Sequence, residues 1–180
     1  MGTGDGAART DGRAACGLPE AAQAVTTPGT GWQAGLDRLG LTLPAVAAPA
    51  GAYIPAVRSG SMVYTAGQLP FVDGALSATG KVGAEVSVEQ AAHAAGLCAL
   101  NALAAVHDLV GLDAVVRIVK VVGFVASAPG FTDQPLVVNG ASELLGEIFG
   151  AAGVHARSAV GVFELPKATP VEVELIAEVR

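Results

Sequence analysis

Aromatic and charged residues are scarce in this sequence of 180 residues. Aromatics make up 4% and charged residues 14%, against a hydrophobic fraction of 52%. Ten basic residues face 16 acidic ones, which gives a net charge of −6. Nucleic acid and anionic membrane surfaces bind clustered Lys and Arg, so we expect neither as a partner. So few charges leave apolar surface uncovered, which predicts that copies of the chain associate.

Cysteine is nearly absent, and its two copies fall in unrelated contexts. Cys16 lies in a polar N-terminal stretch and Cys98 in a helical pattern, which argues against a disulfide framework. His93, His107 and His155 lack the spacing or the carboxylate neighbours of a metal site. No apolar run reaches the roughly 18 residues of a membrane span, and the N-terminus lacks the apolar core of an export signal. We therefore expect a cytoplasmic protein without a metal.

The chain divides into a short N-terminal part and one domain. Residues 1–30 are rich in Gly, Ala and Thr without a sustained period, and we predict a disordered tail. Residues 31–50 hold a short helical pattern followed by two prolines, typical of a helix and a linker. Residues 51–180 are long enough for a single domain with its own core.

The domain carries the pattern of an α+β fold. Ser87 followed by Gln90 has the spacing of a capping box and opens a long helix. Pro129 and Asp133 open a second helix that stops at Gly150. Turn residues between 73 and 86 predict an exposed loop. The predicted order is ββαβαββ, a mixed sheet with both helices on one face, with strands at residues 53–58, 62–66, 114–126, 157–164 and 171–179.

The last predicted strand has two faces of different character. Val171, Val173 and Leu175 alternate with Glu172 and Glu174, so one face is apolar and the other carries carboxylates. With helices on one face only, the other face of the sheet stays bare. We expect a neighbouring chain to cover its apolar part.

Several short strings occur in a fixed order along the domain. They are Gly51-Ala52-Tyr53, Thr65-Ala66-Gly67-Gln68-Leu69-Pro70, Gly80-Lys81-Val82-Gly83-Ala84-Glu85-Val86, Val138-Asn139, His155-Ala156-Arg157-Ser158-Ala159-Val160, Leu165-Pro166 and Val171-Glu172-Val173-Glu174. Each string is short, and the set is specific because all of them occur in order. Together they resemble the RidA (YjgF/YER057c/UK114) family, and most closely its branch of YjgF/chorismate mutase-like endoribonucleases.

The resemblance implies an assembly and an activity. It implies a chorismate mutase-like fold in a homotrimer, whose three sheets form a central barrel with clefts at the subunit interfaces. It also implies a cofactor-independent hydrolase that converts reactive enamines and imines, such as 2-aminoacrylate and 2-iminobutanoate, to 2-keto acids and ammonia. The expected partners are a small carboxylate-bearing substrate and the chain itself.

The resemblance assigns roles to five positions. It makes Arg157 the anchor of the substrate carboxylate and Glu172 the group that orients the attacking water. Tyr53, Asn139 and the backbone of Gly67 would line the cleft. Plainer alternatives exist for most of these positions: a surface arginine, one acid of a polar strand face, a core tyrosine, and a glycine that permits close approach.

Two departures from the better-known branch leave other functions open. Ala66 and Ala159 stand where that branch has Ser and Cys, so neither position supplies a polar group. A trimer that binds a small carboxylate without turnover is therefore one alternative. A ribonuclease is a second, although it would need basic tracks or stacking aromatics that this acidic chain lacks. Chorismate mutase chemistry is an analogy of fold alone. His155, two residues before Arg157, is the histidine expected nearest the cleft.

Overall fold

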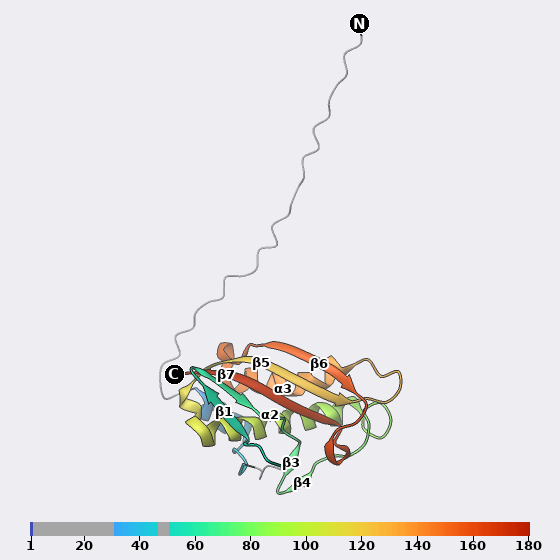
Figure 1. The fold of residues 1–180 in the computed structure, drawn as a ribbon, viewed down its shortest axis with the longest axis horizontal. Helices are drawn as coiled ribbons and strands as arrows, with labels where there is room; N and C mark the ends of the chain where they lie inside the picture. The colour runs from blue at the N-terminus through green and yellow to red at the C-terminus, as the bar shows by residue number, and fades with distance from the viewer. Residues whose placement is uncertain (2–30, 47–50) are drawn as a thin grey trace.

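Apart from Met1, the computed structural model describes residues 31–46 and 51–180, and Figure 1 draws the remainder as a thin grey trace. The predicted disordered tail and the end of the predicted linker lie outside the described residues. The first element is α1 (Trp32–Leu39), which is closed by Gly40 in the left-handed conformation, with φ at 65°. Its Gly35 packs against the backbone of Ile148.

Five strands form a mixed sheet in the order β1-β2-β7-β5-β6 (Figure 1). Their bounds are β1 (Ala56–Ser59), β2 (Met62–Thr65), β5 (Val115–Ala126), β6 (Ala156–Val162) and β7 (Val171–Val179). Neighbouring strands run antiparallel except β5 and β6, which run parallel. The predicted α+β fold is confirmed. Strand β6 is at one edge of the sheet, so within the described part of the chain one side of its backbone has no neighbouring strand.

Two long helices cover one face of the sheet. Helix α2 (Val88–Val110) begins with the predicted capping box, in which Gln90 N donates to Ser87 Oγ and Ser87 N donates to Gln90 Oε1. Helix α3 (Gln134–Phe149) begins after Asp133 with Pro135 in its first turn. Two short 3-10 turns flank this helix layer, η1 (Leu112–Ala114) and η2 (Gly150–Gly153), and a third, η3 (Pro166–Ala168), precedes β7.

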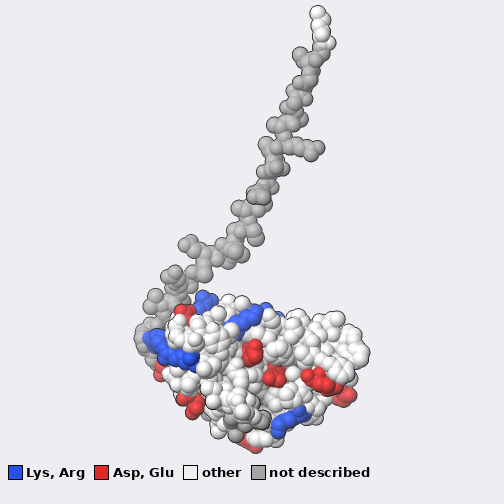
Figure 2. Space-filling model, viewed as in Figure 1, with Lys and Arg blue, Asp and Glu red and all other residues white. Residues whose placement is uncertain are grey.

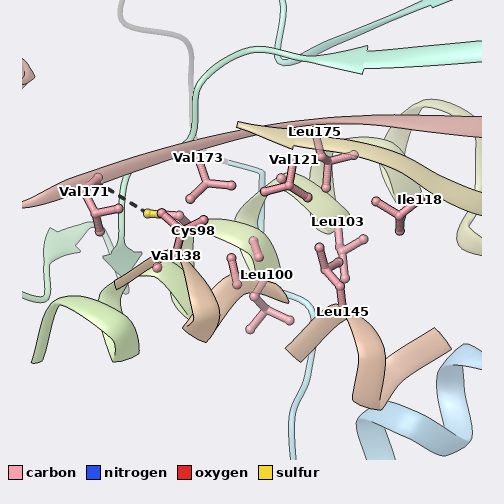
Figure 3. Close-up of a cluster of buried hydrophobic side chains, with 14 of the residues drawn as sticks. Cys98, Leu100, Leu103, Ile118, Val121, Val138, Leu145, Val171, Val173 and Leu175 are labelled. Carbon is pink, nitrogen blue, oxygen red and sulfur yellow. Dashed lines mark hydrogen bonds between the residues drawn. The ribbon is translucent and has the colours of Figure 1, made fainter. Parts of the chain in front are cut away.

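The core lies between these helices and the sheet, and Figure 3 shows Leu103 and Leu145 on the helices below Val121 and Leu175 on the strands. Helix α2 is long and apolar enough to cross a membrane by length and composition, but 61% of its most apolar stretch is buried inside the domain. Burial of this extent is what the central helix of a globular core requires. The apolar character of α2 is therefore accounted for by packing.

The prediction of an exposed loop between residues 73 and 86 is wrong in two respects. A small hairpin of β3 (Phe71–Val72) and β4 (Ala75–Leu76) forms around a turn at Asp73 and Gly74, whose φ values are 50° and 82°. Val82 and Val86 are buried, at 0% and 4% exposure. The reason is long-range: Val82 N donates to Ala126 O, and Val82 O accepts from Ala128 N, so the segment is tied to the end of β5.

Helices α2 and α3 approach so closely that one glycine is indispensable. A Cβ atom on Gly140 would lie 1.8 Å from the carbonyl oxygen of Ala92. Gly146, on the same helix, has open space where its Cβ would be. We expect Gly140→Ala to lower the free energy of unfolding by at least about 2 kcal/mol, because backbone must move. Gly146→Ala should raise it by about 0.5–1 kcal/mol through helix propensity.

Denaturant unfolding of both variants beside the wild type checks this pair. Equal stabilities of the two variants would show that α2 and α3 do not pack in this way.

Among residues 31–46 and 51–180, no helix covers the opposite face of the sheet. Along β7, Glu172, Glu174, Ile176 and Glu178 are partly exposed, whereas the five alternating residues are buried. Arg117, paired with Glu178, and Lys120, paired with Ile176, lie on this same face. Figure 2 shows how sparse charged side chains are over the visible side of the domain. Exposed Val57, Tyr64 and Val160 add apolar surface to the bare face.

Candidate functional site

Arg157 is held by helix α3 through a single nitrogen. Its Nη1 donates to Oδ1 of Asn139 at 2.8 Å and to Oγ of Ser142 at 3.1 Å. Asn139 and Ser142 are one turn apart on α3, so both reach the same group on β6. Within the described residues, Nε and Nη2 make no hydrogen bond. One edge of the half-buried guanidinium is thus fixed, and the Nε–Nη2 edge is free to bind a carboxylate by two parallel hydrogen bonds.

His155 extends this network. Its Nε2 lies 3.1 Å from Oγ of Ser142, and its Nδ1 lies 2.6 Å from the carbonyl oxygen of Gly153. His155 was predicted to lie near the cleft, whereas Ser142 was not among the predicted residues. The i, i+3 spacing of Asn139 and Ser142, which places both on the same side of α3, is the signal that could have identified Ser142.

Glu172 lies against the backbone of Gly67. A Cβ atom on Gly67 would be 1.8 Å from Oε1 of Glu172, so only glycine leaves room for this carboxylate. Hydrogen bonds between Gln68 and Val173, at 2.8 and 3.0 Å, bring the two segments together. Burial raises the pKa of the Glu172 carboxyl, and the charge of nearby Glu174 raises it further.

Tyr53 precedes the first strand and is half exposed, at 49%. Two residues later, the carbonyl oxygen of Pro55 accepts the N–H of Ala66 at 2.8 Å. The segments that carry Tyr53 and Gly67 are therefore neighbours. The predicted strand at residues 53–58 is shorter at its start, since β1 begins after Pro55.

The five candidate residues fall into two groups on opposite faces of the sheet. Arg157 is in register with fully buried Val121, so its side chain lies on the helix-covered face. Glu172 alternates with fully buried Val171 and Val173, so it points away from the helices. We call the first group the arginine half-site, comprising Asn139, Ser142, His155 and Arg157. We call the second the glutamate half-site, comprising Tyr53, Gly67 and Glu172.

Comparison with known proteins gives the family. Residues 33–179 match the model of a family described as "YjgF/chorismate mutase-like, putative endoribonuclease". The chain belongs to this YjgF/chorismate mutase-like family. Protein TCP17 of Trypanosoma cruzi is 45% identical over 149 residues, which cover 82% of this chain and 93% of that protein. The predicted family resemblance is confirmed.

Solved structures of the YjgF family share the fold. One, described as a putative endoribonuclease from Shewanella oneidensis, superposes with a TM-score of 0.80 at 35% identity, over 82% of this chain and 98% of that one. TdcF of Escherichia coli, solved with bound serine, has a TM-score of 0.55 at 29% identity, over 77% of this chain and 95% of that one.

In this YjgF-family chain, neither the thiol of Cys98 nor a cluster of metal ligands adds a further candidate site among the described residues. Cys98 is fully buried, with its Sγ 3.6 Å from Val171 O (Figure 3). Burial, and secondarily the charge of Glu172, raises the pKa of this thiol well above its usual value. Among the described residues, no three His, Cys, Asp or Glu side chains gather where they could hold a metal ion.

Proposed function

We propose that this protein is a cofactor-independent deaminase of 2-imino acids and their enamine tautomers, such as 2-iminobutanoate and 2-aminoacrylate. The observation that carries the proposal is the guanidinium of Arg157, with one nitrogen fixed by α3 and its other edge free. Such an edge matches the carboxylate of an imino acid. Glu172, Asn139, Tyr53 and the Gly67 backbone complete the proposed site.

The proposed chemistry needs only positioning and a base. Arg157 binds the substrate carboxylate, and Glu172 accepts a proton from water as the water oxygen bonds to the iminium carbon. Glu172 returns the proton to nitrogen in the resulting carbinolamine. The C–N bond then breaks as Glu172 takes the hydroxyl proton and the carbonyl forms, which releases ammonia and a 2-keto acid; the ammonia then takes the proton from Glu172 as ammonium. The raised pKa makes the Glu172 carboxylate a stronger base than an ordinary carboxylate, which favours its taking a proton from water.

A complete site requires the arginine half-site of one copy of the chain and the glutamate half-site of another. They lie on opposite faces of one sheet, so no single copy brings Arg157 and Glu172 to one substrate. Exposed apolar residues accompany both groups: Tyr53 and Ile54 near the glutamate half-site, and Leu136 and Val154 on the segments beside the arginine half-site. Two different surfaces that bind each other make a heterologous contact, and such contacts form a ring when the rotation between copies closes. We propose a homotrimer with three such clefts.

Two comparisons bear on the substrate class. TdcF of Escherichia coli was solved with serine, an amino acid with a carboxylate of the kind Arg157 would bind. Endoribonuclease is the activity in the family's description, but the excess of 16 acidic over ten basic residues argues against an RNA substrate. A binding trimer without turnover is the second candidate, since Ala66 and Ala159 give the cleft no polar side-chain atom. A cytoplasmic location remains a prediction.

A coupled assay tests the proposal. An amino acid oxidase or dehydratase generates the 2-imino acid in situ, and semicarbazide traps the fraction that escapes hydrolysis. Purified protein should reduce the trapped fraction in proportion to its concentration. A well-folded oligomer that leaves trapping unchanged, yet binds 2-oxobutanoate, would favour the binding protein instead.

A further inference from the structure

The hydrogen bonds behind Arg157 can run in only one direction. Nη1 of Arg157 always donates, so Oγ of Ser142 accepts at 3.1 Å. The carbonyl oxygen of Gly153 always accepts, so Nδ1 of His155 carries a proton at 2.6 Å. In neutral imidazole Nε2 is then an acceptor, and the hydroxyl proton of Ser142 is donated to it. This series of hydrogen bonds links Arg157 to Ser142, Ser142 to His155, and His155 to the carbonyl of Gly153.

We propose that Ser142 and His155 are positioning residues that hold the free edge of Arg157 in place for the substrate carboxylate. This inference rests on the proposed function. It goes further by assigning a role to two residues that would not touch the substrate. Without an acceptor at Nε2, the Ser142 hydroxyl loses its orientation, and Arg157 keeps Asn139 as its one fixed partner.

The tautomer of His155 tests the geometry without any activity. In full-length protein labelled with 15N at histidine, long-range proton–nitrogen spectra distinguish a protonated Nδ1 from a protonated Nε2, and His155→Gln assigns the signal. We expect Nδ1 to carry the proton in neutral His155. A proton on Nε2 would overturn the proposal. This readout stays informative even where the wild type hydrolyses no imine, which would overturn the proposed function instead.

Kinetics of matched variants test the role. His155→Phe and Ser142→Ala should raise KM for 2-iminobutanoate about tenfold with kcat within about twofold, the signature of lost carboxylate binding. His155→Gln, whose Oε1 can still accept from Ser142, should keep KM near that of the wild type. His93→Phe, at an exposed site on α2, is the control. Equal KM values for His155→Phe and His155→Gln would refute the positioning role.

Discussion

Arg157→Ala is expected to lower kcat/KM for 2-iminobutanoate by about a hundredfold or more. Two charge-assisted hydrogen bonds to the carboxylate would be lost, each worth about 1.5–3 kcal/mol. The loss should be large because Arg157 is half-buried and already oriented by Asn139 and Ser142, so little ordering entropy offsets the bonds. The semicarbazide assay measures it directly.

Two further variants give this result its meaning. Arg157→Lys keeps the positive charge but loses the planar pair of donors that binds a carboxylate through two hydrogen bonds. It should retain only a small part of the activity. Arg38→Ala removes an arginine of α1 that donates to the Glu147 carbonyl, away from both half-sites, and should hydrolyse imine like the wild type. Full activity in Arg157→Ala would remove the carboxylate anchor from the account.

Glu172→Gln is expected to abolish turnover and, at the same time, to stabilise the fold at neutral pH. An amide cannot take the proton of the attacking water, and loss of a positioned base lowers kcat by about 10²–10⁴-fold. The stability change follows from the raised pKa of the carboxyl, whose main cause is burial. Between its usual value of 4.5 and the raised value, the folded state binds more protons than the unfolded state. Stability therefore falls as pH rises through this window.

The stabilisation should consequently depend on pH. Glu172→Gln should exceed the wild type in melting temperature at pH 7 to 8, and the difference should vanish below the usual carboxyl value of 4.5, where Glu172 is protonated in both states. Glu174→Gln is the control: it should retain turnover and shift the acid limb of kcat to lower pH, because the like charge beside Glu172 is gone. A variant that loses activity but melts like the wild type at every pH would contradict a buried, proton-holding Glu172.

Local signals predicted most of the fold. The capping box of Ser87 and Gln90 fixes the start of α2, and the alternation from Val171 to Val179 gives β7 and its two faces. Hydrogen bonds between segments far apart in the sequence could not be predicted from local patterns. Val82 is buried because its backbone bonds to residues 126 and 128, and nothing near it in the sequence distinguishes it from a loop valine.

The sequence predicted five residues for the candidate site, but it did not predict that they lie on opposite faces of the sheet. Family strings pointed to Arg157, Glu172, Tyr53, Gly67 and Asn139 as members of one cleft. Their separation onto two faces follows from register, since Arg157 pairs with Val121 and Glu172 pairs with Phe124, and register requires the whole sheet. Ser142 lies in none of the strings that resemble the family, so the resemblance did not point to it.

The central claim is that each active site is built from two copies of the chain, and mixed oligomers test it most directly. Arg157→Ala and Glu172→Gln chains, each with its own affinity tag, are expressed together and purified through both tags, so that every trimer contains both variants. In a ring of three with heterologous contacts, each mixed trimer has one interface with Arg157 from one copy and Glu172 from the next. The account predicts about one third of the wild-type activity from two inactive chains. No activity in a folded mixed trimer would show that both residues serve a site within one chain and would contradict the account.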